Sequence, residues 1–172
     1  VYKRQKQELL EDHGHVLGLR DINIDVPDKC IRVIMGLSGS GKSTLIRHIN
    51  RLIEPTSGEV LVGGEDVLAM SDEELKNFRR SKASMVFQKF ALLPHRTVIE
   101  NVGYGLQIQK ISETEINKRS QHWIDRVGLT GFEDHYPAQL SGGMQQRVGL
   151  ARALATDAEI LLMDCLLYTS PS

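Results

Sequence analysis

The chain has 172 residues, which corresponds to one domain at roughly 150 residues per domain. Hydrophobic residues make up 41% and charged residues 25%, and the only cysteines are Cys30 and Cys165, so a disordered tail, a fibrous repeat and a disulfide scaffold are excluded. The 21 basic residues nearly balance the 22 acidic ones, so no overall charge draws the chain to nucleic acid or to anionic lipid.

Two strands are predicted first. Residues 22–26 alternate apolar and polar side chains, which is typical of a half-buried strand. Residues 30–35 form a β-branched apolar run of the kind found in a sheet covered on both faces. A helix is expected over about 42–53, where apolar residues recur at helical spacing, and it should stop before Pro55.

Further along the chain, strands are predicted at 60–62 and at about 83–88. Helices are expected to begin at Ser71, Thr97 and Ser112, because each is followed three residues later by glutamate, the spacing of a capping box. A helix from about 142 to 154 and a buried strand over Ile160–Met163 complete the pattern. Strands that alternate with helices predict an α/β fold with a largely parallel sheet and a helical insertion at about 89–150.

Residues 36–43 read GLSGSGKS and satisfy the phosphate-loop pattern G-x-x-x-x-G-K-[ST] between a predicted strand and a predicted helix. Glycines let the backbone curl so that its N–H groups point at phosphate oxygens, and the start of the helix adds a partial positive charge. Lys42 would reach the β and γ phosphates of ATP or GTP, and the Ser43 hydroxyl would hold Mg²⁺. The alternative is a glycine-rich turn that binds nothing.

Two other segments could complete such a site. Asp164 ends a predicted strand and could hold Mg²⁺ through water, although a strand-end carboxylate of no function is the alternative. Residues 140–147 read LSGGMQQR and open a predicted helix, with Ser141 at the cap position and two glycines exposing the first amides. Cap chemistry alone explains that segment equally well.

From about His13 to Asp164, the sequence resembles the nucleotide-binding subunit of ABC transporters. Residues 36–43 look like the Walker A loop, Gln88 like the Q-loop glutamine, residues 140–147 like the LSGGQ signature and residues 160–164 like Walker B. The resemblance implies a P-loop NTPase fold with a mainly parallel sheet, an N-terminal antiparallel β part and a helical insertion. Without the neighbouring motifs, Gln88 would read as a polar strand end.

The resemblance also implies ATP and Mg²⁺ as cofactors. Lys42, Gln88 and Asp164 would be catalytic, and Ser43, Gln88 and Asp164 would bind the metal. His13 stands where the family usually places the aromatic ring that stacks on adenine. The residues implied in nucleotide binding are His13, Gly36, Ser38, Gly39, Ser40, Gly41, Lys42, Ser43 and Thr44 of one copy, with Ser141, Gly142 and Gly143 of a second copy.

The partners implied by the resemblance are a second ABC subunit and a membrane complex. Two copies would form a head-to-tail homodimer in which Lys42 of one copy and Ser141 of the other share one ATP. The segment from Lys89 to Thr97 would receive a cytoplasmic helix of integral membrane permease subunits, and a solute-binding protein would act indirectly. The subunit would lie in the cytoplasm on the inner face of the membrane. No apolar stretch approaches the roughly 18–20 residues of a spanning helix, and no nucleic-acid partner is expected.

Four segments, residues 33–39, 50–58, 90–95 and 136–140, look like the subfamily that imports glycine betaine, proline and related quaternary amines. The implied function is the ATP-binding subunit of such an importer. The alternatives are an ABC subunit for another small solute such as an amino acid, a P-loop small-molecule kinase, and an ABC protein acting on ribosomes or DNA. A kinase has no use for residues 140–147, and the last class typically fuses two nucleotide domains.

The resemblance ends after Asp164. Cys165 stands where the family has the glutamate that activates the attacking water, and a thiol with a pKa of about 8.5 is mostly protonated at neutral pH. Residues 1–5 and 165–172 look foreign to the family. We therefore expect a single nucleotide-binding domain truncated after Walker B, without the D-loop and the switch histidine, that does not turn over ATP.

Overall fold

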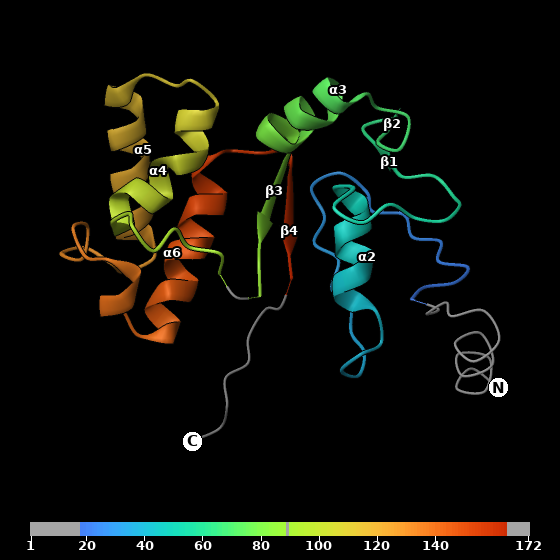
Figure 1. The fold of residues 1–172 in the computed structure, drawn as a ribbon, viewed down its shortest axis with the longest axis horizontal. Coiled ribbons are helices and arrows are strands. Elements are labelled where there is room, and N and C mark those ends of the chain that lie inside the picture. Colours follow the sequence, from blue (N-terminus) through green and yellow to red (C-terminus); the bar gives the residue numbers. More distant parts are fainter. Residues whose placement is uncertain (1–17, 89, 165–172) are drawn as a thin grey trace. The chain divides into compact units, whose positions relative to one another are not determined.

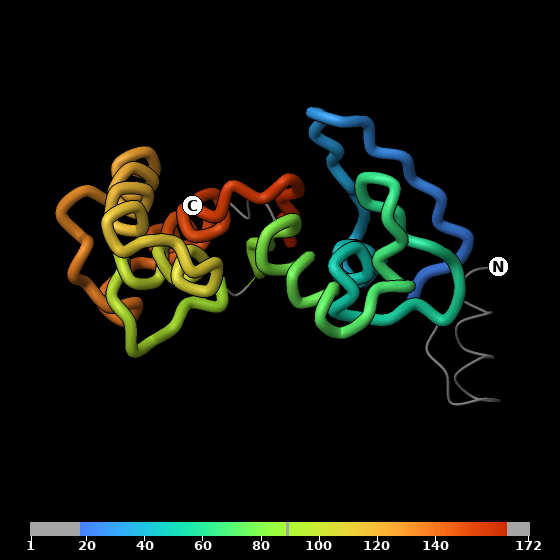
Figure 2. Tube along the Cα trace, turned by 90° about the horizontal axis from the view of Figure 1, so that it is seen from above, coloured from blue at the N-terminus to red at the C-terminus, as the bar shows by residue number. Residues whose placement is uncertain are grey.

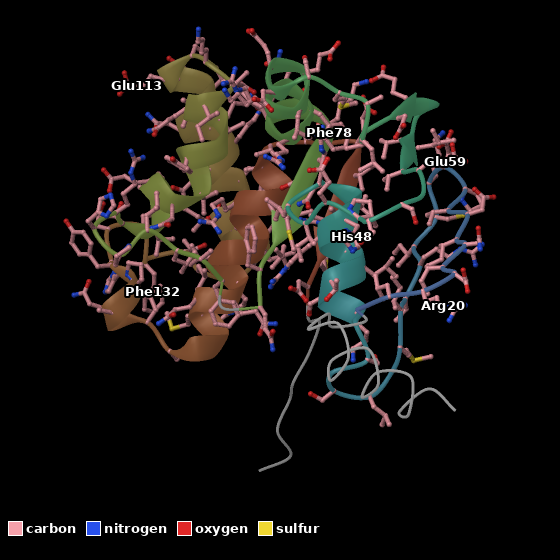
Figure 3. The ribbon with its side chains drawn as sticks, turned by 45° about the vertical axis from the view of Figure 1, so that its right-hand side comes forward. Arg20, His48, Glu59, Phe78, Glu113 and Phe132 are labelled. Carbon is pink, nitrogen blue, oxygen red and sulfur yellow. The ribbon has the colours of Figure 1, made fainter. Side chains whose placement is uncertain are left out.

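The computed structural model describes residues 18–88 and 90–164, and the chain divides into two compact units, residues 1–57 and 58–172 (Figure 1). Among the described residues of the first unit, the helix is α2, Lys42–Ile49. It begins where the spacing predicts but ends four residues early. Arg51 adopts a left-handed φ of 50°, the Leu52 amide donates to the Arg47 carbonyl, and the ring of His48, labelled in Figure 3, contacts the Ile53 carbonyl at 2.7 Å. These bonds close the end of the helix with a turn.

The prediction of strands at 22–26 and 30–35 is wrong. Both segments lie outside any strand, and Figure 2 shows the blue trace of this part without a helix. Ile31, Val33 and Met35 are 91%, 68% and 86% exposed rather than buried. An apolar run sets which side chains could face a core, but a strand also needs a hydrogen-bonded neighbour, and none of the described residues supplies one.

The second unit begins with a hairpin. β1, Leu61–Val62, pairs antiparallel with β2, Glu65–Asp66, so the strand predicted at 60–62 is confirmed in a shorter form. Gly63 and Gly64 connect the two strands with φ values of 57° and 83°, a left-handed pair that suits a two-residue hairpin turn. Sequence analysis missed β2, although the glycine pair between apolar and polar residues was a usable signal.

Helix α3, Asp72–Asn77, continues into a π-helix, Phe78–Lys82, whose buried first residue Phe78 is labelled in Figure 3. The capping box at Ser71 is confirmed, because the Ser71 amide donates to Glu74 Oε2 at 2.8 Å and the Glu74 amide donates to Ser71 Oγ at 3.4 Å. The helix start predicted at Ser112 is confirmed, because Ser112 is the N-cap of α5, Glu113–Arg126, but its side chain makes no cap bond. Its partner glutamate, Glu115, instead accepts from Arg119 one turn later.

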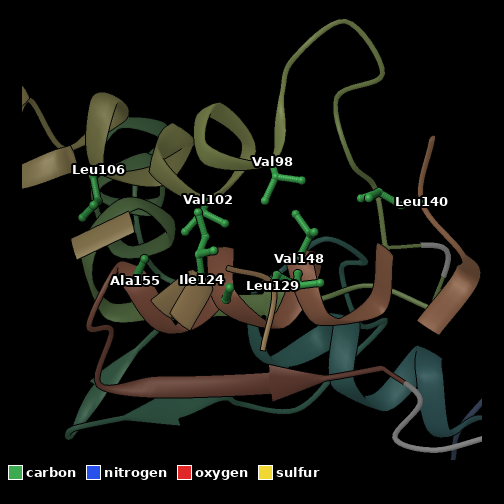
Figure 4. Close-up of a cluster of buried hydrophobic side chains, with 9 residues drawn as sticks. Val98, Val102, Leu106, Ile124, Leu129, Leu140, Val148 and Ala155 are labelled. Carbon is green, nitrogen blue, oxygen red and sulfur yellow. The ribbon is translucent and has the colours of Figure 1, made fainter. Parts of the chain in front are cut away.

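Three helices form the main core of this unit: α4, Val98–Ile108, α5, Glu113–Arg126, and α6, Gly142–Ala155. The 3₁₀ turn Pro137–Gln139 precedes α6. The three helices pack against one another (Figure 4). The buried apolar cluster comprises Val98, Val102, Leu106, Ile124, Leu129, Leu140, Val148, Ala151 and Ala155. The helical insertion that the sequence predicts is therefore a packed group with its own apolar core.

The parallel pair of strands lies beside these helices. β3, Ala83–Val86, pairs in parallel with β4, Ile160–Met163, in a register that places Val86 opposite Met163. Both strands confirm the sequence prediction. The Ser84 hydroxyl donates to the Ala153 carbonyl at 3.0 Å, which ties the sheet to α6. Because the two strands are parallel, their carboxyl ends meet at one edge. That the whole chain forms a single nucleotide-binding domain stays a prediction.

The capping box of α4 leads to an expected pH effect. The Glu100 carboxylate accepts the Thr97 amide at 2.8 Å, and the backbone and hydroxyl bonds of Thr97 hold the pKa of Glu100 below its ordinary value of 4.5. A depressed folded-state pKa contributes stability above about pH 4.5 that is lost as pH falls through the folded-state value. Between about pH 6 and about pH 3.5, a range that spans this titration, the free energy of unfolding of Glu100→Gln should therefore fall less than that of the unaltered chain.

Urea unfolding monitored by circular dichroism at several pH values measures this. Glu73→Gln is the matched control, because Glu73 lies in the first turn of α3 and makes none of the capping bonds found there. The pH dependence of Glu73→Gln should follow the unaltered chain more closely than that of Glu100→Gln. Identical pH dependence in all three proteins would contradict the role assigned to the Glu100 carboxylate.

Candidate functional site

The phosphate loop leads directly into α2. Within residues 36–43 the Ser40 amide donates to the Leu37 carbonyl at 3.2 Å, and Gly39 and Gly41 have left-handed φ values of 76° and 94°. Gly41 is the N-cap of α2 and offers no side chain to the first amides of the helix. Those N–H groups carry the positive end of the helix dipole, so an anion placed at the loop would accept them.

Two of the glycines have close neighbours. A Cβ on Gly36 would lie 2.7 Å from Ser40 Oγ, and one on Gly41 would lie 2.7 Å from a Leu19 methyl carbon and 3.1 Å from the Gly18 carbonyl. At Gly41, which has a left-handed φ and a backbone carbonyl nearby, a larger side chain would distort the loop, whereas at Gly36 the Ser40 hydroxyl would have to move.

The Lys42 side chain bends back along the loop. Its ammonium donates to the carbonyls of Gly36 and Leu37, each at 2.7 Å. This holds the positive charge beside the exposed residues Ser38 and Gly39, and phosphate oxygens could exchange with the two carbonyls as charge-assisted acceptors. Ser43 and Thr44, the other predicted ligands, lie half-buried in the first turn of α2.

Gln88 and Asp164 lie at the same edge of the parallel strand pair. The Asp164 amide donates to the Val86 carbonyl at 2.9 Å, which extends the pairing one residue beyond β4, and Asp164 is 3% exposed. Gln88 follows β3 by two residues and is exposed. Carboxylate and amide oxygens suit Mg²⁺, which keeps several waters and phosphate ligands rather than a full protein cage. Among residues 18–88 and 90–164, no cluster of three metal-binding acidic, histidine or cysteine side chains occurs.

The second glycine-opened helix end is the start of α6. Ser141 is its N-cap and accepts the Met144 amide at 3.3 Å, as cap chemistry predicts. Ser141, Gly142 and Gly143 are all exposed, and a Cβ at either glycine would meet no atom within 4 Å. The cap occupies the Met144 amide, whereas the exposed Gly142 and Gly143 place no side chain over the helix start, so the positive end of the helix dipole stays accessible to an anion.

Each unit thus assembles part of the predicted site. The loop residues come together in the first unit, and Gln88, Asp164 and the start of α6 belong to the second. His13 and Cys165 lie outside the described residues, as does Lys89.

Sequence analysis missed two residues that hold the segment after Gln88. Asn101 is fully buried, accepts the Leu93 amide at 2.8 Å and donates to the carbonyls of Leu93, Arg96 and Thr97. Arg152 donates to two carbonyls of the same segment, as discussed below. A signal for Asn101 was present, because an amide side chain stands beside Val98 and Val102 on the apolar face of a predicted helix.

Comparison with known proteins decides the family. The sequence pattern of the ABC transporter family matches residues 19–165. The chain belongs to the ABC transporter family. The model superposes on a solved ABC cassette, described as a dimeric post-hydrolysis state of MJ0796 bound to ADP and Pi, with a TM-score of 0.80, 40% identity and coverage of 85% of this chain and 65% of that one. The fold is therefore that of an ABC ATPase cassette, of the P-loop NTPase class.

Curated members of the ABC family include similar sequences. The glycine betaine transport ATP-binding protein OpuAA of Bacillus subtilis is 54% identical over 94% of this chain and 38% of its own length. The glycine betaine/proline betaine protein ProV of Escherichia coli is 50% identical over 92% of this chain and 40% of its own length. The methionine import protein MetN of Desulfitobacterium hafniense is 48% identical over 95% of this chain and 46% of its own length. The chain thus spans about two fifths of the length of these ABC proteins.

No helix in the described part of this ABC chain is both long and apolar enough to cross a membrane.

Proposed function

We propose that this chain is the ATP-binding region of an ABC importer subunit that couples ATP binding and hydrolysis, in a head-to-tail homodimer, to uptake of glycine betaine or proline-type osmolytes. One observation supports this most strongly. The start of α2 has glycine as its N-cap, and α6 begins with two exposed glycines, so these residues place no side chain over either helix start. The negative charge of one triphosphate is sufficient to bind both helix starts, the start of α2 from one copy and the start of α6 from the other.

In the proposed site, Lys42 and the amides of the phosphate loop bind the β and γ phosphates, with Gly36, Ser38, Gly39, Ser40, Gly41 and Thr44 around them. Ser43, Gln88 and Asp164 supply oxygen ligands for Mg²⁺, which when bound neutralises the charge that develops during phosphoryl transfer. His13 contributes the surface for adenine. Ser141, Gly142 and Gly143 of the second copy approach the γ phosphate. The exposure of the last three residues and the shared sheet edge of Gln88 and Asp164 support this assignment.

The proposed partners are integral membrane permease subunits that contact residues 89–97, with a periplasmic or extracellular solute-binding protein acting through them. The subunit would then lie at the inner face of the membrane. The described part of the segment supports this, because Ala91, Pro94 and His95 are exposed while the backbone is held by Asn101.

The solute is supported by the relatives. The glycine betaine and proline betaine proteins are 50–54% identical to this chain. A second candidate is an importer of an amino acid, because methionine import proteins are 47–48% identical. Membership of the ABC family leaves the small-molecule kinase without support.

A chimera tests the proposed function. Residues 19–164 replace the matching segment of OpuAA in a Bacillus strain that lacks its own betaine importers. Uptake of labelled glycine betaine should be restored, whereas uptake of methionine should not rise. The same chimera with Lys42→Ala should be produced at the same level without uptake. A chimera that binds ATP and the permease but imports no betaine would contradict the proposed solute.

Two further chimeras test the proposed effect of Cys165. They differ only in the residue after Asp164, which is glutamate in one and cysteine in the other. The cysteine form should bind ATP with unchanged affinity and hydrolyse it at least about 100-fold more slowly, because a protonated thiol cannot act as the general base. Equal hydrolysis rates in the two forms would refute the proposal that cysteine at position 165 prevents hydrolysis.

A further inference from the structure

Arg152 joins α6 to the segment that follows Gln88. Its two terminal nitrogens donate to the carbonyls of Phe90 at 2.7 Å and Ala91 at 2.8 Å. One turn earlier on the same helix, a Cβ on Gly149 would lie 3.6 Å from Phe90, so this face of α6 packs closely against the segment. The planar guanidinium thus holds two successive carbonyls, a fork that a lysine ammonium cannot reproduce.

The carbonyls that Arg152 holds belong to residues in an uncommon backbone conformation. Phe90 and Ala91 have φ values of 55° and 47°, and neither is glycine. Left-handed conformations of such residues persist only where their surroundings hold them. Arg152 supplies two of the holding bonds, and the Phe90 amide supplies a third by donating to the Phe87 carbonyl at 2.9 Å.

The charge of Arg152 makes this contact more than ordinary packing. Burial lowers the pKa of its guanidinium, and no carboxylate of the described residues lies within ion-pair distance of it. The two carbonyls are therefore the hydrogen-bond acceptors that compensate a half-buried cation. If the segment moved away, the Arg152 charge would lose both carbonyls. The position of α6 is therefore tied to the position of the segment.

Arg152 also stands on the same helix as the proposed contact with ATP. It follows Ser141 by eleven residues, a distance of about 16 Å along a rigid helix. At the other end of the segment, Asn101 of α4 holds Leu93, Arg96 and Thr97. Residues 90–97 are therefore clamped at both ends by the helical group.

We propose that Arg152 is a positioning residue that couples residues 90–97 to α6, so that a displacement of this segment is passed to the glycine-opened start of the helix. This inference rests on the proposed function in taking residues 90–97 as the contact with the membrane partner. Arg152 itself touches neither ATP nor the partner in this scheme.

Hydrogen exchange of this chain tests the clamp directly. In Arg152→Lys, amides of residues 90–97 should exchange at least about tenfold faster, because the charge stays but the fork is lost. Arg147→Lys is the matched control, since Arg147 lies on the same helix and also donates to two carbonyls, those of Val127 and Gly128. Its effect should be confined to the turn after α5. Unchanged exchange at 90–97 in Arg152→Lys would overturn the proposal.

A folding failure would be visible in the same data, because amides of α5 would then exchange fast as well. Arg152→Gln, which removes both the fork and the buried charge, serves as the second variant and should loosen residues 90–97 without loosening α5. Loss of protection throughout the helical group in both variants would show that Arg152 is a general stability residue and would overturn the proposed coupling.

A functional measurement separates coupling from stability. In the OpuAA chimera reconstituted with its permease, Arg152→Lys should leave ATP affinity unchanged and lower betaine uptake per ATP hydrolysed several-fold. A parallel loss of affinity and uptake, with the ratio unchanged, would contradict the proposal. If the unaltered chimera imports nothing, the proposed function fails, whereas the exchange experiment still decides whether Arg152 holds the segment.

Discussion

Lys42→Ala is expected to weaken ATP binding by about 30- to 150-fold, equivalent to about 2–3 kcal/mol. The substitution removes the ammonium that lies against the Gly36 and Leu37 carbonyls. It also leaves those carbonyl oxygens facing the phosphates without a positive charge between them. Isothermal titration calorimetry of the chain with Mg²⁺ and ATP measures the effect.

Lys118→Ala is the control for this experiment, because Lys118 is an exposed lysine in the interior of α5, where alanine favours the helix. Its ATP affinity should equal that of the unaltered chain. If Lys42→Ala bound ATP as tightly as Lys118→Ala does, the phosphate-loop assignment of residues 36–43 would be wrong.

Gly143→Asp should strongly weaken ATP-dependent association of two copies without changing ATP binding by one copy. A Cβ at this exposed position would meet no atom within 4 Å, so we expect the fold to accommodate the substitution. The negative charge should even stabilise α6 by about 0.3–1 kcal/mol, because it lies in the first turn of the helix. The same charge repels the γ phosphate that the start of α6 is proposed to bind, so association should weaken more than tenfold.

Sedimentation velocity with and without Mg²⁺ and ATP measures association. Gly143→Asn matches the aspartate in shape without its charge and should retain more ATP-dependent association. Thermal unfolding provides the check on stability. An aspartate variant that associates with ATP as readily as the asparagine variant would show that no phosphate approaches this helix end.

The features that the sequence predicts well are local. The start of α2, the capping boxes at Ser71 and Thr97 and the start of α6 each depend on residues within a few positions of one another. β3 and β4 were also predicted, because short β-branched or apolar runs between turn residues carry a strong signal. The Walker A and signature motifs are of this local kind, which is why the family was recognisable from sequence.

The features that the sequence did not predict depend on distant partners. Residues 30–35 have the composition of a buried strand, yet pairing depends on a neighbour that the pattern does not name. Ser112 has a glutamate at the right spacing, but Arg119 competes for it successfully. Arg152 reaches carbonyls some sixty positions earlier in the chain, and no periodicity of α6 marks it as different from a surface arginine.

Mixing two defective variants tests the shared-ATP arrangement most directly. Lys42→Ala lacks a working phosphate loop, and Gly143→Asp lacks a working start of α6, so neither can form a complete site with its own kind. A mixed pair has one complete site, made of the loop from the Gly143→Asp copy and the start of α6 from the Lys42→Ala copy. With donor and acceptor dyes on the two variants, energy transfer should appear on addition of Mg²⁺ and ATP only in the mixture. Its absence from the mixture, or equal transfer within either variant alone, would contradict a site shared between two copies.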